Sequence, residues 1–257
     1  MKTGITLYNF APMCKTAEGL HEVLARLKQI GYSVVQVSSI PPEVTADEIA
    51  GMLKEFDLEC CITHVAWNRY LEDIGGVVED HKKWNCRHAA LGMLPWEYYT
   101  PEGLERFLGE LPSVAQALAS EGLDFSYHNH AHELIRYKEL GGSTWLDELY
   151  RRTSADELKA ELDLHWLARG GVEPSDFVRR LAGRIPVLHF KDYQIHKDNE
   201  VRFAPPGEGN LNWQAIVEAA RQGGCEYVVF EQDDPYETDR FELAETALAN
   251  MQSLIAA

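Results

Sequence analysis

The stretch LKAELDLHWLARGGVEPSDFVRRLAGRIPVLHFKDY, residues 158–193, carries the pattern that decides the fold. Apolar and polar residues alternate over 158–166 and again over 185–193, which predicts two β-strands. Between them, 174–183 has a proline near its start and a glycine at its end, the usual asymmetry of a short helix. A strand, a helix and a further strand in succession predict a repeating strand–helix unit.

The same alternation runs from one end of the chain to the other. Strands are expected over 4–10, 32–38, 58–65, 87–95, 123–130, 158–166, 185–193 and 227–233. Helices are expected near 19–30, 45–55, 72–85, 101–121, 143–152, 174–183, 211–222 and from 238 onward, with a kink or restart at Pro112. Eight such units in 257 residues predict a (β/α)8 TIM barrel, an α/β fold formed by one domain over 1–257. The alternative, an open doubly wound sheet, usually has a Gly-rich turn after its first strand, and YNFAPMCK (8–15) contains no glycine.

Composition and charge exclude several classes of protein. The formal net charge is −17, whereas nucleic acid or an anionic membrane as partner requires clustered Lys and Arg. No apolar run is long enough to span a membrane, and the first residues are too polar for a signal peptide. Five cysteines without a CxxC pair argue against a disulfide framework and a zinc knuckle. We therefore expect a cytoplasmic protein, and the sequence leaves a homo-oligomer open.

Titratable side chains end five of the predicted strands. In a TIM barrel the site lies at the carboxyl ends of the strands, where side chains of one parity point into the mouth. Parity assigns to inward faces His64, His128, His130, Glu161, Asp163, His165, His189, Lys191, Glu231 and Asp233. One histidine at a strand end is more often a hydrogen-bonded core residue than a ligand. Five strands that end in such groups indicate a shared site.

A divalent cation would offset the cost of burying this set. Carboxylates and imidazoles without partners cost several kcal/mol each when they leave water, and a shared cation gives them a counter-charge or a lone-pair acceptor. Nitrogen and oxygen ligands without cysteine leave Mn²⁺, Co²⁺, Fe²⁺, Mg²⁺ and Zn²⁺ open. The many carboxylates favour Mn²⁺, so the sequence predicts one divalent metal ion with Mn²⁺ as first choice.

Five further segments occur in a fixed order along the chain. They are YHNHAHEL (127–134), ELDLHW (161–166), GRIPVLHFKD (183–192), PPGEGNLNW (205–213) and VVFEQD (228–233). Together they resemble the xylose isomerase-like TIM-barrel superfamily, and within it the sugar phosphate isomerase/epimerase family. The resemblance covers most of the chain, is strongest over 123–234, and implies a metal-dependent enzyme of carbohydrate metabolism.

The resemblance also implies a ligand set of a Glu, an Asp, a His and a second Glu from strands five to eight. Asp163, His189 and Glu231 match three of these positions. Epimerases of this superfamily carry the other Glu within strand five, where this chain has His128 or His130, and the nearest carboxylate is Glu133 in the following loop. Glu133 is therefore the expected fourth ligand, with His128 or His130 as the substitute. This departure weakens the transfer of a mechanism in which two metal-bound glutamates exchange a proton.

The expected chemistry is proton transfer next to a sugar carbonyl through a metal-stabilised enediolate. Glu133 or Glu231 on one face and His130 on the other are expected to take and return the proton. Lys191 is expected to bind a substrate hydroxyl or stabilise an enediolate oxygen. The product would be that of an isomerase or epimerase. Loss of the hydroxyl β to the carbonyl would instead make the enzyme a lyase, as in the inosose dehydratase-like members of the family.

Substrate contacts are expected from residues around the barrel mouth: His64, His128, His165, Trp166, Lys191 and Glu208. Glu208 lies between glycines that let a backbone approach a ligand, whereas Asn210 or Asn212 fits a helix cap. Trp67, Trp96 and Trp166 follow strands and suit either a wall for a sugar ring or the core. No Arg or Lys cluster marks a phosphate site, which favours a non-phosphorylated sugar or keto-sugar.

Two interpretations from other classes remain. An endonuclease IV-like phosphodiesterase shares the barrel but needs a multi-zinc cluster and a basic DNA-binding face, which a net charge of −17 disfavours. A non-catalytic sugar-binding barrel would keep the pocket and lose the metal. Metal analysis of protein purified without added metal separates it from the enzyme.

Overall fold

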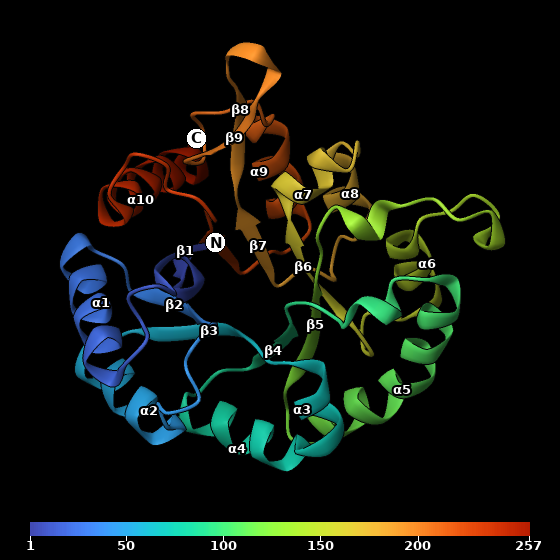
Figure 1. Cartoon of the computed structure of the whole chain (residues 1–257), viewed down its shortest axis with the longest axis horizontal. Coiled ribbons are helices and arrows are strands. Elements are labelled where there is room, and N and C mark those ends of the chain that lie inside the picture. Colours follow the sequence, from blue (N-terminus) through green and yellow to red (C-terminus); the bar gives the residue numbers. More distant parts are fainter.

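Eight parallel strands close into a barrel that helices surround (Figure 1). The computed structural model describes residues 1–257. The strand order around the barrel is β1-β10-β7-β6-β5-β4-β3-β2. The bounds are β1 (Lys2–Thr6), β2 (Val34–Val37), β3 (Glu59–His64), β4 (His88–Leu91), β5 (Asp124–His128), β6 (Lys159–Asp163), β7 (Val187–Phe190) and β10 (Tyr227–Phe230). The prediction of a single-domain TIM barrel is confirmed.

The helices follow the strands in the predicted order. They are α1 (Ala17–Ile30), α2 (Ala46–Glu55), α3 (Trp67–Glu72), α4 (Ile74–Lys83), α5 (Pro101–Ser120), α6 (Trp145–Arg152), α7 (Leu164–Arg169), α8 (Pro174–Arg180), α9 (Trp213–Gln222) and α10 (Arg240–Ala256). Local chemistry sets their ends: Thr45 and Glu48 form a capping box at α2, and Gly31 ends α1 with a left-handed φ of 117°. Pro112 does not interrupt α5, which remains one helix.

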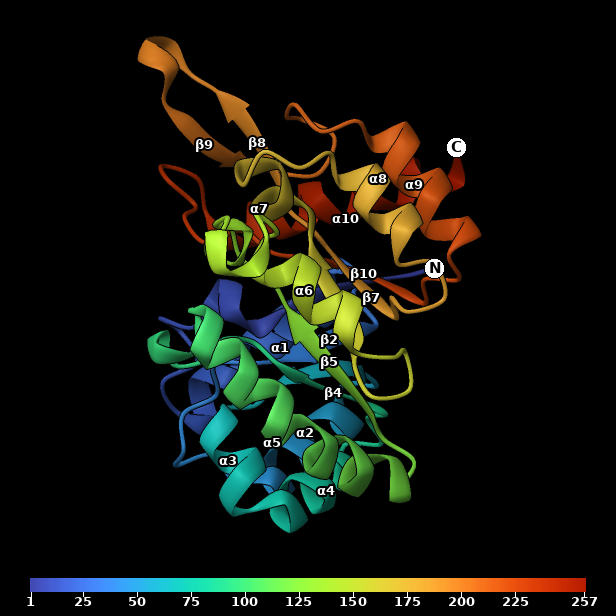
Figure 2. The same ribbon diagram turned by 90° about the vertical axis from the view of Figure 1, so that its right-hand side faces the viewer.

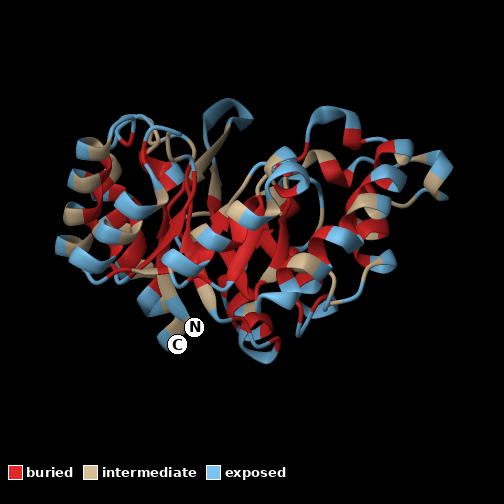
Figure 3. Cartoon of the chain, turned by 90° about the horizontal axis from the view of Figure 1, so that it is seen from below, coloured by how far each residue is buried: buried red, intermediate tan, exposed pale blue.

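The core lies mainly between the strands and the ring of helices. Figure 3 shows buried residues along the strands and exposed ones on the outer faces of the helices. Leu188 and Phe190 belong to a cluster of 65 buried apolar residues. Val187 and Val229 share the other side of their strands with His189 and Glu231 and belong to a separate cluster of six. Strands buried on both faces are typical of a parallel barrel, and here one face carries the polar groups near its carboxyl end.

All eight strands end earlier than predicted, and two of these ends affect predicted or observed site residues. The strand expected over 158–166 stops at Asp163, because the Asp163 carboxylate accepts a hydrogen bond from Trp166 N (2.9 Å) and so caps α7. The first strand ends at Thr6 and continues as a 3-10 turn, Leu7–Phe10. His165 and Tyr8 therefore lie beyond their strands, and strand parity does not decide where they point.

An antiparallel hairpin, β8 (Asp192–Ile195) and β9 (Val201–Ala204), was not expected. It follows β7 and projects away from the barrel (Figure 2). The PPGEGNLNW segment follows β9 and wraps the Asp192 carboxylate, which accepts hydrogen bonds from Gly207 N, Gly209 N and the Trp213 indole. A Cβ on Gly209 would lie 2.4 Å from Asp192 Oδ1, so the glycine permits this close approach.

All five cysteines are buried and free. None of the helices has the length and apolar character needed to cross a membrane.

Candidate functional site

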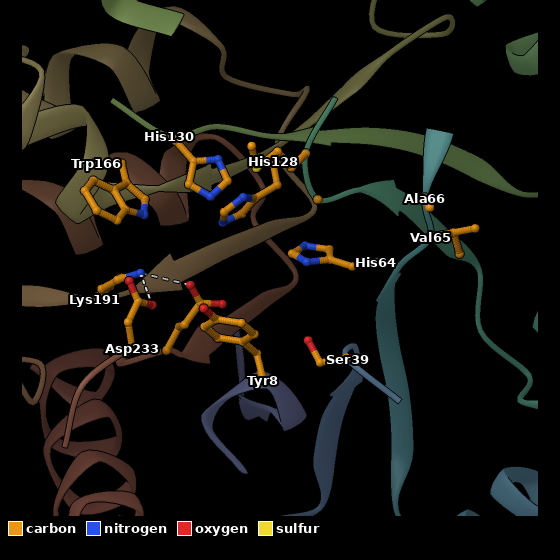
Figure 4. A pocket seen from close by; sticks show the side chains of 13 residues that line it. Tyr8, Ser39, His64, Val65, Ala66, His128, His130, Trp166, Lys191 and Asp233 are labelled. Carbon is orange, nitrogen blue, oxygen red and sulfur yellow. Dashed lines mark hydrogen bonds and ion pairs between the residues drawn. The ribbon is translucent and has the colours of Figure 1, made fainter. Parts of the chain in front are cut away.

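A cavity of about 490 Å³ opens where the carboxyl ends of the strands meet (Figure 4). His64 at the end of β3, His128 at the end of β5, and Lys191 and Glu231 just beyond β7 and β10 line it. In Figure 4 the side chains of His64, His128 and Lys191 point toward one space from different strands. The structure thus brings this group of predicted site residues together.

Four side chains form what we call the inner cluster: His128, Asp163, His189 and Glu231. One ligand atom from each lies within 4.8 Å of the others. His189 Nδ1 lies 3.1 Å from His128 Nε2 and 3.3 Å from Glu231 Oε2, and both imidazoles lie near Asp163 Oδ2 at 3.8 and 3.9 Å. All four residues are buried.

The hydrogen bonds of His189 fix which nitrogen faces the cluster. Its Nε2 lies 2.7 Å from Gln36 Oε1 and 2.8 Å from Glu161 Oε1. Two oxygens around Nε2 hold a proton there, so Nδ1, which faces Glu231 and Asp163, is the nitrogen that would give up its proton to bind a cation. A carboxylate behind a histidine in this way is the usual support for a metal-ligating imidazole.

The inner cluster fits a divalent cation. Ligand atoms about 2.0–2.2 Å from one metal ion lie roughly 3–4 Å from each other, and the four contacts above fall within that range. Asp163 Oδ2 is buried and has no hydrogen-bond partner, although its Oδ1 accepts from Trp166 N. A buried carboxylate oxygen without a donor is costly unless a cation compensates it, and the Lys191 ammonium group, 3.6 Å away, lies beyond hydrogen-bond distance.

The pKa shifts of the inner cluster follow from its charges. Burial lowers the pKa of His189, but the Glu231 and Glu161 carboxylates outweigh it and raise the pKa to about 10. The pKa of His128 is lowered to about 4. Burial is the largest cause, the charge of the nearby His189 lowers the pKa further, and the Asp163 carboxylate acts in the opposite direction. Burial raises the pKa of Glu231, but Lys191 and His189 hold it well below the usual value. The cluster thus keeps both carboxylates ionised.

Lys191 is the cationic centre of the cavity. Its Nζ lies 3.0 Å from Glu231 Oε1, 2.6 Å from Asp233 Oδ1 and 3.6 Å from Asp163 Oδ2. It also lies over the Trp166 and Phe203 rings at 4.9 and 5.0 Å. Burial lowers its pKa, but the three carboxylates outweigh this and raise it above the usual value. The ammonium group therefore stays charged.

Glu133 lies apart from Asp163, His189 and Glu231, in what we call the rim cluster: His130, His132 and Glu133. Its buried carboxylate accepts hydrogen bonds from Tyr127 Oη (2.8 Å) and His130 N (2.9 Å). These bonds hold the Glu133 carboxylate toward the loop. His128 therefore occupies the position beside Asp163, His189 and Glu231 that the sequence predicts for Glu133. Of the two histidines predicted to replace Glu133 as a ligand, His128 and His130, the structure brings only His128 into the inner cluster.

The other predicted site residues divide into two groups. His64, His130 and Trp166 line the cavity, and His64 Nε2 lies 2.8 Å from Glu161 Oε2. His165 is buried on α7 against Phe203, with 4.8 Å between ring centroids, and does not line the cavity. Glu208 is exposed outside it and accepts a hydrogen bond from Asn250 Nδ2 (3.1 Å).

The remaining tryptophans and asparagines also lie outside the cavity. Trp67 is buried and donates to Glu110. The Trp96 ring is 66% exposed and lies beside His132. Asn212 caps α9, in agreement with the prediction that an asparagine of this segment caps the following helix.

Three contributing residues escaped the sequence analysis. Tyr8 and Ser39 line the cavity, and Gln36 supports His189. Gln36 carried a signal, because it is the one polar residue in the buried strand VVQV. Tyr8 and Ser39 lie two residues beyond β1 and β2, where the backbone has left the strand geometry and the tertiary fold decides their direction.

Comparisons with known proteins agree on the fold. A sequence model of the xylose isomerase-like TIM barrel family matches residues 24–254. An inosose dehydratase of Lacticaseibacillus casei is 24% identical in an alignment 163 positions long, which covers 57% of this chain and 53% of that protein. The chain thus spans about half the length of this curated relative.

Solved structures resemble the whole barrel. A sugar phosphate isomerase/epimerase of Parabacteroides distasonis ATCC 8503 superposes with a TM-score of 0.79 at 19% identity, covering 98% of this chain and 93% of that one. An L-ribulose 3-epimerase superposes with a TM-score of 0.76 at 17% identity, covering 100% and 95%.

Two further similar structures hold metal ions. The IOLI protein, solved with a bound zinc atom, gives a TM-score of 0.75 at 14% identity and covers 100% of this chain and 98% of that one. A barrel protein of Mycobacterium smegmatis in complex with magnesium gives 0.75 at 12% identity, covering 99% and 96%.

Proposed function

Because the chain belongs to the xylose isomerase-like TIM barrel family, we propose that it is a divalent-metal-dependent sugar isomerase or epimerase. One observation carries the proposal: the inner cluster converges beside the cavity, which its members His128 and Glu231 line, and its buried Asp163 Oδ2 has no hydrogen-bond partner. The similarity to a sugar phosphate isomerase/epimerase and to L-ribulose 3-epimerase supports the same class.

The inner cluster is the proposed metal site, with His128, Asp163, His189 and Glu231 as ligands. Bound there, the cation would supply Lewis-acid chemistry, which eases removal of a proton next to a carbonyl. Mn²⁺ remains the first choice for this mixed nitrogen and oxygen set, with Co²⁺, Mg²⁺, Fe²⁺ and Zn²⁺ as alternatives. The two metal-containing neighbours support a divalent ion without selecting one.

Two sides of the cavity offer groups that hold or move a proton. His130 lies on one side, with its Nδ1 3.8 Å from Glu133 Oε1. Burial lowers the pKa of His130, but the Glu133 carboxylate more than offsets this, so the pKa lies above its usual value. His130 is thus the proposed acid–base group on this side, and Glu133 orients it rather than acting on the substrate.

Glu231 and Asp233 lie on the other side, beside Lys191. The low pKa of Glu231 makes it a weak base, whereas burial and the Glu231 charge raise the pKa of Asp233 against the effect of Lys191. Glu231 and Asp233 are therefore both proposed proton acceptors on this side, and Asp233 is the stronger base. Lys191, permanently charged, is placed to stabilise an oxygen that gains negative charge.

The cavity suits a neutral polar substrate. Lys191 is the only lysine or arginine that lines it, and three carboxylates already surround its ammonium group. Trp166 offers one aromatic face to a sugar ring. A non-phosphorylated sugar or keto-sugar is therefore the proposed substrate. A cytoplasmic location, supported by five free buried thiols, completes the proposal.

A dehydratase acting on a keto-sugar or inosose is the second candidate. The similarity to an inosose dehydratase favours it, as does Lys191, a charged donor placed beside possible leaving hydroxyls. Both reactions begin with loss of a proton next to a carbonyl, and they differ in whether the proton returns or a hydroxyl leaves. They therefore share one assay.

The test is a panel of keto-sugars and inososes incubated with metal-loaded protein in D₂O. Deuterium uptake with unchanged molecular formula identifies an isomerase or epimerase, and loss of water identifies a lyase. His189→Ala should lower both bound metal and turnover, because it removes the central ligand. Unchanged metal stoichiometry in His189→Ala, or turnover that survives removal of the metal, would refute the proposal.

A further inference from the structure

The rim cluster presents a second set of converging ligand atoms. His130 Nδ1 lies 3.8 Å and His132 Nε2 3.5 Å from Glu133 Oε1. The three atoms lie within 4.8 Å of one another, and both nitrogens are buried without a hydrogen-bond partner. We propose that the rim cluster is a second divalent-cation site of the zinc type, and that its occupation inhibits the enzyme by immobilising His130.

The distances suit a zinc-like ion. Two donors about 2.1 Å from a tetrahedral zinc lie roughly 3.4 Å apart, so the observed contacts need only small ring rotations. Two imidazoles and one carboxylate, with a position left for water, form a known donor set of mononuclear zinc sites. Imidazole nitrogen favours Zn²⁺, Co²⁺, Ni²⁺ or Cu²⁺, whereas Mg²⁺ and Ca²⁺ prefer oxygen.

Surrounding residues hold two of the three ligands in place. Tyr127 Oη and His130 N both donate to the Glu133 carboxylate, which is fully buried. The His132 ring lies beside Tyr99 and Trp96, with centroids 4.1 and 4.9 Å away. A cation here would therefore meet ligands that are already oriented.

One cation would satisfy every group in this cluster that lacks a partner. It would take up the free lone pairs of both imidazoles and balance a buried carboxylate. The cluster holds one carboxylate, whereas the inner cluster holds two. Binding is therefore weaker than at the inner cluster, so the rim site fills only when the cation is in excess.

Inhibition depends on which nitrogen the cation takes, and this part rests on the proposed function. His130 Nδ1 faces Glu133, so a cation there leaves Nε2 as the nitrogen that carries the ring proton. An imidazole bound in this way cannot accept a proton from the substrate. Occupation of the rim cluster therefore removes one of the two proton carriers.

A zinc titration of the metal-stripped full chain tests the site, with bound metal measured by equilibrium dialysis and elemental analysis. We expect two zinc ions per chain for the natural sequence and one for His132→Phe, which keeps the aromatic packing and removes a ligand. His128→Ala keeps three ligands at the inner cluster, so it should still bind two zinc ions, with the inner one held more weakly and the rim one unchanged. Circular dichroism checks that each variant folds. A single zinc in the natural sequence at saturation, or two in His132→Phe, would overturn the site.

Inhibition is measured separately, with Mn²⁺ saturating and Zn²⁺ added in excess, and with the bound Mn²⁺ determined by elemental analysis so that exchange at the inner cluster is recognised. The zinc concentration for half-inhibition should rise at least about tenfold in His132→Phe, the effect of losing one ligand. Equal inhibition of both proteins would overturn the inhibitory role. If no substrate turns over, the proposed function fails, while the zinc stoichiometry still decides whether the rim site exists.

Discussion

The two ends of the barrel strands both carry charged residues, but they use them differently. At the amino-terminal end, Lys2 Nζ lies 2.6 Å from Glu59 Oε2, and the Tyr227 hydroxyl donates to the same carboxylate. Asp124 lies 3.2 Å from His88 Nδ1 and 3.0 Å from Arg87 Nε. These acids therefore form ion pairs with cations of their own, although Asp124 Oδ2, like Asp163 Oδ2, accepts no hydrogen bond.

At the carboxyl-terminal end the charges converge. Two imidazoles and two carboxylates meet in the inner cluster, two ring nitrogens lie 3.1 Å apart, and Asp163 Oδ2 has no donor. Such an arrangement lowers the stability of the empty protein and is retained where a ligand compensates it. The amino-terminal end of the barrel thus stabilises the fold, whereas the carboxyl-terminal end is the proposed binding end.

Removing a charge from the inner cluster should have the largest effect. Glu231→Gln keeps the shape and removes a proposed ligand, so turnover should fall by about a thousandfold or more while the fold remains. Steady-state kinetics with a circular dichroism control measures this. Normal activity in Glu231→Gln would show that the carboxyl-terminal end is not the reacting end.

His130→Asn comes next, because it removes the proposed acid–base group and leaves the inner cluster intact. Turnover should fall by about a hundredfold or more, the usual contribution of such a group, with bound metal at the inner cluster unchanged. Kinetics and elemental analysis of one preparation separate the two effects. A parallel loss of inner-cluster metal would mean that His130 acts as a ligand instead.

Glu161→Gln tests the support behind the metal site. Glu161 lies 2.8 Å from both His189 Nε2 and His64 Nε2 without belonging to the inner cluster. Its loss should weaken metal binding about 10- to 100-fold, because the carboxylate orients His189. A competition titration against a chelator gives the affinity, and an unchanged value would show that Gln36 alone orients the ring.

The smallest effect is expected from Asp124→Asn at the opposite end. Burial raises the Asp124 pKa, but His88, Lys159 and Arg87 outweigh this and hold it below 3.8. A lowered folded-state pKa gives stability above pH 3.8 that is lost as the pH falls through the folded value. The variant should be less stable by about 1 kcal/mol at pH 7, with activity unchanged and with the difference shrinking at more acidic pH.

Urea unfolding at pH 7, 5 and 3.5 measures this difference. Equal stability of the two proteins at pH 7, or a loss of turnover in Asp124→Asn, would contradict the inference that the amino-terminal end stabilises the fold and takes no part in the reaction.

Much of the site could be predicted from strand parity, and its failures have local causes. His128, Asp163, His189 and Glu231 lie at or just beyond strand ends, where the period of two fixes direction. His165 was assigned to the same face as Asp163, but the backbone turns into α7 after Asp163. The sequence predicts Glu208 as a substrate contact. The glycines on either side of it, Gly207 and Gly209, instead let their backbone N–H groups donate to the Asp192 carboxylate.

The sequence by itself determined the eight-fold alternation and the order of the polar strand ends, because hydrophobic period and turn residues are local properties. Only the tertiary structure decided that His128 joins Asp163, His189 and Glu231 while Glu133 turns away to Tyr127. The reason is physical: barrel closure and the hydrogen bonds of one loop set these distances, and both depend on contacts between residues far apart in the chain.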